Sequence, residues 1–136
     1  MDPDVARKFL NDHHHAVLAT FRGHGRPQMS PVTVAVDADG YVLVSTRETA
    51  VKTKNVRKDP RVSLCVLSDT FYGSWTQIDG LAVVVSLPEA MELLVDYYRI
   101  AAGEHPDWDE YRAAMDRERR VVLRIAIERA GPDVSG

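Results

Sequence analysis

The stretch Val44–Val62, which reads VSTRETAVKTKNVRKDPRV, determines how the first half of the chain is organised. It begins at the end of Tyr41–Ser45, a run of mostly β-branched and aromatic residues that predicts a strand. A short helix should follow, capped by Thr46 or Thr49, until a proline ends it. Arg61–Leu67 then predicts the next strand. The stretch therefore indicates a strand, a short helix and a second strand in succession.

Hydroxyl and cationic side chains are concentrated in this same stretch. Ser45 and Thr46 at the strand end, and Lys52 further on in the helix, can converge on one anion. The free amide groups and positive dipole end of the helix would also favour a phosphate or carboxylate. The alternative is a solvated basic helix, because runs of charge usually face water. The cationic residues are Arg47, Lys52, Lys54, Arg57, Lys58 and Arg61.

Length and composition limit the class of protein. The chain has 136 residues, of which 45% are hydrophobic and 27% charged, and a net charge of -3. These values predict one globular domain over residues 1–136 and no general affinity for nucleic acid. No apolar run approaches the ~20 residues of a membrane span, and no secretion signal is recognisable at the N-terminus. We therefore expect a cytoplasmic protein with no membrane span.

The remaining segments predict a mainly β, α+β fold. A capped amphipathic helix is expected over residues 3–13, and a barrel or strongly bent sheet over about residues 15–129. Roughly six strands, mostly antiparallel, with short flanking helices favour a small barrel over a doubly wound parallel sheet. The strand segments are 15–21, 26–36, 41–45, 61–67, 71–85 (one long bent strand or a pair) and 120–128, and the later helices are 88–103 and 107–117.

Motifs for metal binding and for common catalytic chemistry are absent from the sequence. His13, His14 and His15 are consecutive, so their side chains point in different directions and cannot all bind one ion. Neither the common phosphate-binding glycine motifs nor the nucleophile motif of hydrolases occurs. A cofactor with its own reactivity is then the simplest source of chemistry. Because a small barrel has little interior room, such a cofactor should lie in a groove completed by a second subunit of a homodimer.

Four segments in order resemble a known family. The chain is similar to the pyridoxamine 5'-phosphate oxidase-like split β-barrel proteins, in particular the branch that binds the deazaflavin coenzyme F420. The similarity extends from about residue 5 to residue 127, with the order of the segments intact. The segments are Val17–Thr20 (VLAT), Gly25–Val32 (GRPQMSPV), Lys52–Val62 (KTKNVRKDPRV) and Tyr98–Trp108 (YRIAAGEHPDW).

The resemblance implies a six-stranded antiparallel split β-barrel that forms a homodimer with two flavin or deazaflavin sites at the subunit interface. The phosphate side of the cofactor would lie near the end of the 41–45 strand and the helix after it, and the ring near residues 28–32. Trp75 would close the site from the other subunit, or else be a buried structural side chain. The residues implied to bind the cofactor are Gln28, Met29, Ser30, Pro31, Val32, Ser45, Thr46, Lys52, Asn55 and Trp75.

Two departures from the family pattern affect the expected ligand. Some deazaflavin-binding relatives have an arginine two positions before the phosphate lysine, where this chain has Ala50. The anion contact would then be shared with Arg47 or Lys54. The tryptophan, arginine and histidine signature that binds the substrate phosphate in true pyridoxamine phosphate oxidases is missing from residues 119–125. Vitamin B6 synthesis is therefore not expected.

The resemblance implies an F420-dependent oxidoreductase that transfers hydride between the cofactor and a small organic substrate. No catalytic side chain is identified, and no metal is expected. One alternative is an FMN-dependent enzyme of the same fold, because the two cofactors share a tricyclic ring and a nearby phosphate. Another is a non-catalytic protein that binds a flavin or deazaflavin.

Overall fold

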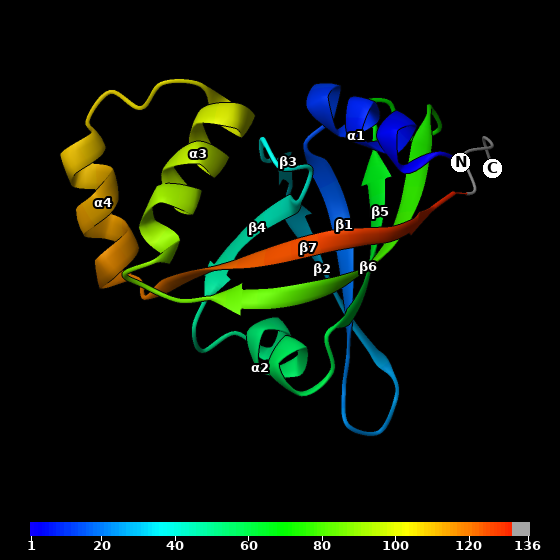
Figure 1. Cartoon of the computed structure of the whole chain (residues 1–136), viewed down its shortest axis with the longest axis horizontal. Coiled ribbons are helices and arrows are strands. Elements are labelled where there is room, and N and C mark those ends of the chain that lie inside the picture. Colours follow the sequence, from blue (N-terminus) through cyan, green and yellow to red (C-terminus); the bar gives the residue numbers. More distant parts are fainter. Residues whose placement is uncertain (132–136) are drawn as a thin grey trace.

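The computed structural model describes residues 1–131, and its strands form one antiparallel sheet that curls into a half-barrel (Figure 1). The strands are β1 (His15–Phe21), β2 (Pro27–Thr33), β3 (Ala35–Val36), β4 (Val42–Arg47), β5 (Arg61–Leu67), β6 (Trp75–Val85) and β7 (Arg120–Ala130). Their order across the sheet is β2-β1-β5-β6-β7-β4-β3. The α+β split-barrel prediction is confirmed. Residues 132–136, which the predicted domain included, lie outside the described residues.

Four helices surround the sheet: α1 (Pro3–Asp12), α2 (Val51–Lys58), α3 (Ala90–Ala102) and α4 (Trp108–Arg117). In Figure 1, α1 lies above the sheet and α2 below it. Helices α3 and α4 form a pair at the left, between the end of β6 and the start of β7. Among the helices of residues 1–131, none is long and apolar enough to span a membrane.

The described part of the sheet has seven strands, so the prediction of six was wrong by one. The segment expected as a single strand over residues 26–36 divides at Val34 into β2 and β3. The Val34 amide still donates to the His14 carbonyl oxygen at 2.8 Å, whereas Ala35 and Val36 pair with β4. The division occurs because the chain must leave β1 at this point and cross to β4, which closes the barrel.

The predicted cap of α2 was also wrong. Thr46 is a buried residue of β4, and the helix begins after Ala50, which makes no side-chain capping bond. Thr53 instead donates its hydroxyl to the Arg47 carbonyl oxygen at 2.7 Å, which ties the helix to the end of β4. The amide groups of the first turn have no partner within the helix, as at any helix start.

The strand part of the 71–85 segment is one long strand, β6, rather than a pair, and it begins only at Trp75. Its bend is a register shift between Asp79 and Gly80 in the pairing with β7. A Cβ atom at residue 80 would overlap the Ala126 carbonyl oxygen, so only glycine allows the two strands to approach this closely. The bulge therefore depends on a position that the sequence marked as a break.

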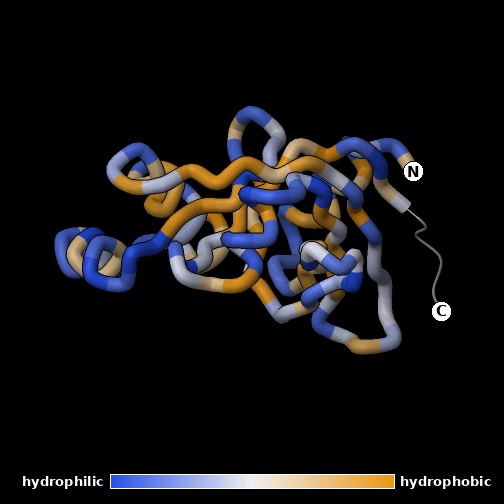
Figure 2. Tube along the Cα trace, turned by 90° about the horizontal axis from the view of Figure 1, so that it is seen from below, coloured by the Kyte–Doolittle hydropathy of each residue, from blue (hydrophilic) through white to orange (hydrophobic). Residues whose placement is uncertain are grey.

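Two hydrophobic clusters stabilise the fold. The larger one fills the barrel and includes Leu18, Leu64 and Ile125, which are fully or almost fully buried. The smaller one packs α3 and α4 against the outer side of β4 and β7 through residues such as Leu94 and Val122. Figure 2 shows the hydrophobic strands in the middle of the molecule and hydrophilic loops around them. The helical pair therefore has its own packing surface, separate from the barrel interior.

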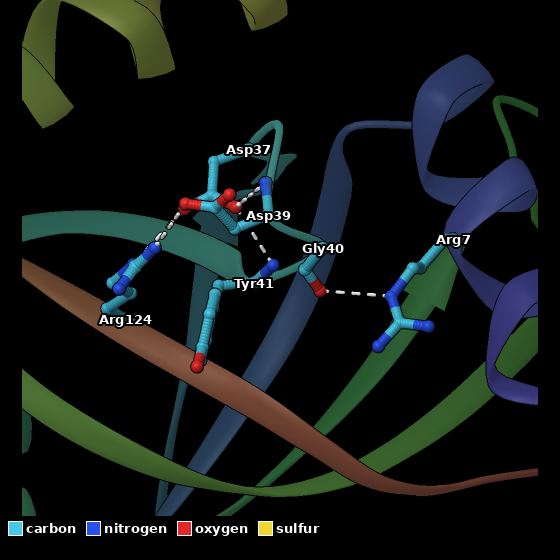
Figure 3. A network of polar contacts seen from close by, with 6 residues as sticks. All are labelled: Arg7, Asp37, Asp39, Gly40, Tyr41 and Arg124. Atoms are coloured by element: carbon cyan, nitrogen blue, oxygen red, sulfur yellow. Dashed lines mark hydrogen bonds and ion pairs between the residues drawn. The ribbon is translucent and has the colours of Figure 1, made fainter.

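A polar network joins the β3–β4 turn to β7 and α1 (Figure 3). Asp37 accepts hydrogen bonds from the backbone amides of Asp39 and Tyr41, at 2.9 and 3.0 Å. Its other carboxylate oxygen accepts from Arg124 Nε at 3.1 Å, while the guanidinium carbon of Arg124 lies 3.9 Å from the centre of the Tyr41 ring. Arg7 of α1 donates to the Gly40 carbonyl oxygen at 3.0 Å. Every charged group drawn here therefore has a partner within the chain.

Candidate functional site

An open groove of about 680 Å³ lies between the barrel and the α3–α4 pair. Strands β2, β4 and β7, the start of α2 and both later helices contribute to its lining. The lining residues are Pro31, Val32, Thr33, Ser45, Thr46, Arg47, Thr49, Ala50, Lys52, Tyr97, Tyr98, Tyr111, Met115 and Arg120. The groove combines an apolar wall with hydroxyl groups and three cations, and it has no acidic lining residue.

Five residues predicted from the sequence meet in this groove. Pro31 and Val32 line it from β2, Ser45 and Thr46 from the end of β4, and Lys52 from the first turn of α2. A sixth predicted residue, Ser30, accepts a hydrogen bond from Lys52 Nζ at 3.4 Å. Antiparallel pairing of β1 with β2, and of β4 with β7, carries these segments to one end of the barrel.

Lys52 is the most unusual charge in the groove. Its side chain is partly buried, and no Asp or Glu of residues 1–131 forms an ion pair with it. Burial lowers the pKa of Lys52 below its ordinary value, and the nearby positive charge of Arg120 lowers it further. The first turn of α2 also has no acidic residue, although acidic side chains stabilise that position. The groove therefore contains a partly buried positive charge that no carboxylate of residues 1–131 neutralises.

The opposite wall consists of aromatic side chains whose hydroxyls are mostly engaged. Tyr97 donates its hydroxyl to the Thr33 carbonyl oxygen at 2.9 Å, which joins α3 to β2. Tyr111 donates to the Leu94 carbonyl oxygen at 2.8 Å. Burial raises the pKa of Tyr97, and it raises the pKa of Tyr111 to about 12. These two phenols stay protonated at neutral pH and present ring surface to the groove.

Besides Ser30, which contacts Lys52, four predicted residues lie outside the groove lining. Gln28 donates to the Met29 carbonyl oxygen at 3.3 Å, and its own amide oxygen is buried without a partner among the described residues. The Met29 side chain is exposed. Asn55 is buried and donates to the Thr20 hydroxyl at 3.1 Å, so its amide faces the barrel. Trp75 lies beside α1 in a separate groove of about 310 Å³.

Several lining residues were not expected from the sequence. Tyr97, Tyr111 and Met115 belong to helices whose position against β4 and β7 no local pattern indicates. Arg120 had a weak signal, because it follows Arg119 and is the first residue of the last strand, but no sequence motif connects it with the groove. Of the described residues, no group of three His, Cys, Asp or Glu side chains is arranged as metal ligands.

Known proteins of similar sequence and structure include reductases and heme-binding proteins. An F420H(2)-dependent biliverdin reductase from Mycobacterium tuberculosis is 29% identical over 126 residues, which cover 93% of this chain and 84% of that protein. A conserved hypothetical protein from the same species has a TM-score of 0.77 at 28% identity, covering 96% of this chain and 82% of its own.

Two more distant structures show the fold alone. A protein described as an F420 reductase has a TM-score of 0.72 at 20% identity, covering 92% of this chain and 94% of its own. A heme storage protein from Vibrio cholerae has a TM-score of 0.71 at 17% identity, covering 99% and 96%. The same barrel therefore occurs in proteins described by different ligands.

The sequence profile of the pyridoxamine 5'-phosphate oxidase family matches residues 3–132, nearly the whole chain. The match includes every strand of the sheet and every segment that lines the groove. The chain therefore belongs to the pyridoxamine 5'-phosphate oxidase family.

Proposed function

We propose that this protein is an F420-dependent oxidoreductase that binds the deazaflavin in the groove between the barrel and the α3–α4 pair. One observation carries the proposal: the partly buried Lys52 ammonium group has no acidic partner among residues 1–131 and lies beside hydroxyl groups at the start of a helix. The phosphate of F420 supplies the missing negative charge. The similarity to an F420H(2)-dependent reductase at 29% identity supports this choice of cofactor.

The residues of the groove fit the two ends of such a cofactor. Lys52, Ser45 and Thr46 would hold the phosphate through charge-assisted and hydroxyl hydrogen bonds. Pro31 and Val32 would give the ring an apolar surface that excludes water. The bound deazaflavin supplies the hydride chemistry through its C5 atom, so the protein's contribution is binding and orientation. Gln28 and Ser30 remain candidates for hydrogen bonds to the ring edge.

The proposal includes a homodimer of single-domain subunits. The groove is open along one side, and the exposed Met29 and Pro31 side chains lie beside it on β2. Trp75 lines a separate groove beside α1, so it would reach a cofactor only in a partner subunit. A cytoplasmic location stays a prediction, which fractionation of cells would test.

A non-catalytic binding function is the second candidate. Two of the three phenols in the groove are engaged with backbone carbonyls and have raised pKa values, which leaves few groups able to protonate a product. A protein that only binds its cofactor would need no such group. Turnover of reduced cofactor with a panel of hydride acceptors separates the two candidates.

Titration of the purified protein with coenzyme F420 and, separately, with FMN tests the proposal. Cofactor fluorescence should change with F420 at concentrations that leave FMN unbound. Preference for FMN would assign the protein to the flavin-dependent members of the fold. Failure to bind either cofactor would contradict the proposed function.

A further inference from the structure

Two arginines of the groove lie directly opposite each other. In the register of β4 and β7, Arg47 pairs with Arg120, and both side chains line the groove. Like charges at directly opposed positions of an antiparallel pair destabilise it. This arrangement therefore needs negative charge close by.

Among residues 1–131, one carboxylate pairs with the two arginines. Glu118 Oε1 accepts from Arg120 at 3.1 and 2.8 Å, and from Arg47 at 3.4 Å. The hydrogen bond from Arg120 holds the pKa of Glu118 below its ordinary value, so the carboxylate is ionised at neutral pH. With Lys52, the groove has three cations against one adjoining carboxylate, which leaves two positive charges (3 - 1 = 2).

Arg120 lies near the middle of the lining rather than at its rim. Its side chain is 27% exposed, compared with 59% for Arg47. Its positive charge acts on Lys52, on Tyr97 and on Tyr111, which belong to three different helices. An anion between the first turn of α2 and the tyrosines would therefore be within reach of both Lys52 and Arg120.

We propose that Arg120 is a second anion-binding residue of the groove, that Glu118 competes with the ligand for it, and that the groove takes a ligand with at least two negative charges. The inference rests on the proposed function in one respect, because it takes this groove as the ligand site. The guanidinium group suits a carboxylate or a phosphate through paired hydrogen bonds. Lys52 then holds one anionic group and Arg120 the other, or both hold one dianion.

Inorganic pyrophosphate is a suitable probe, because it carries several charges and no ring. Calorimetric titration of the full chain should give a dissociation constant that rises about tenfold or more in Arg120→Gln. The rise should be smaller in Arg120→Lys, which keeps the positive charge but loses the paired hydrogen bonds. Glu118→Gln should bind pyrophosphate about three to ten times more tightly, because the competing carboxylate is gone. Thermal unfolding of each variant monitors its folding.

Glu92→Gln is the matched control for Glu118→Gln. Glu92 forms an exposed ion pair with Arg112 on α3 and α4, so the substitution changes the net charge equally without altering the groove. The control should bind pyrophosphate as the unchanged protein does. Equal affinities in Glu118→Gln and Glu92→Gln would overturn the competing role of Glu118. Equally weak binding by Arg120→Lys and Arg120→Gln would show that Arg120 acts only through its ion pair, and would also overturn the inference.

Parallel titration with F420 separates this inference from the proposed function. Pyrophosphate binding that depends on Arg120 and Glu118, without binding of F420, would refute the cofactor and keep the anion subsite. Binding of F420 that depends on Lys52, with pyrophosphate affinity unchanged in Arg120→Gln, would keep the cofactor and refute the subsite. Absence of pyrophosphate binding in the unchanged protein would also refute it.

Discussion

Arg124 and Lys52 are both partly buried cations on the barrel, but they differ in the partners that the chain provides for their charges. Arg124 donates to Asp37 and Asp39 and lies over the Tyr41 ring. Among residues 1–131, the Lys52 ammonium group forms one long hydrogen bond, to the Ser30 hydroxyl at 3.4 Å. The first charge is neutralised by the fold and stabilises it, whereas the second is desolvated without compensation. The proposed function assigns the second charge to a ligand, because folding alone gives no reason to keep it.

The largest effect is expected on the free energy of unfolding, in the polar network around Asp37. Asp37→Ala removes the acceptor of two backbone amides and of Arg124, so the free energy of unfolding should fall by about 3 kcal/mol, as for other buried pairs that lose one partner. Urea unfolding measures this loss. Asp39→Ala is the matched control, because that side chain is 76% exposed and should change stability by less than about 1 kcal/mol. Similar losses in both variants would contradict the special role of Asp37.

Lys52→Ala should weaken cofactor binding without lowering the stability of the fold. Affinity for F420 should fall by about 1.5 to 3 kcal/mol, the range for a hydrogen bond to a charged group. The free energy of unfolding should not decrease, because the substitution removes a desolvated charge. Fluorescence titration and urea unfolding measure the two quantities. Lys58→Ala at an exposed position of α2 is the control, and an equal loss of affinity there would indicate general surface charge instead of a specific anion contact.

Tyr111 lines the groove, but its hydroxyl has a hydrogen-bond partner within the chain. It tests whether such a residue stabilises the fold, as Arg124 does. Its folded pKa of about 12 lies above the ordinary value of 10, so its stabilising contribution is complete below pH 10 and is lost as the pH rises towards 12. Tyr111→Phe should reduce the free energy of unfolding by about 1 kcal/mol at pH 7 and make its decline between pH 10 and 12 less steep. Chemical unfolding across this pH range measures both effects. Tyr72→Phe, at an exposed position, should change neither the free energy of unfolding at pH 7 nor its decline between pH 10 and 12.

The smallest expected effect is the pH dependence of cofactor binding. Because burial lowers the pKa of Lys52, its charge is lost at a lower pH than that of a free lysine. Affinity for F420 should therefore weaken a few-fold as the pH rises, and the decline should begin below the usual lysine range. Lys52→Arg should abolish this decline, since arginine stays charged. An identical decline in both proteins would assign the titration to another group.

Local sequence patterns were sufficient for most of the secondary structure. The β5 prediction matches residue for residue, and the ends of α1 and α4 differ by one residue at most. Strands in which buried and exposed positions alternate can be predicted from the sequence alone. The errors occurred at Val34, where the strand divides, and at Ala50, where the helix starts. Both depend on closure of the barrel, which no window of neighbouring residues contains.

The candidate site was predicted in part for the same reason. Ser45, Thr46 and Lys52 lie close together in sequence, so their convergence in the groove follows from one strand–helix unit. The orientation of Asn55 depends on the packing of α2 against Thr20 of β1, which the charge pattern does not reveal. Residues separated by many positions have no local signal for their contact.

By itself, the sequence determined the strand and helix segments, the family and the concentration of cations after β4, because these depend on residue type and short spacing. Only the tertiary structure decided that α3 and α4 complete the groove, and that Arg120 lies opposite Arg47 with Glu118 between their charges. Whether a charge is neutralised depends on side chains brought together by packing of distant segments. That is why Arg124 and Lys52, which are equally basic in the sequence, have different roles in the fold.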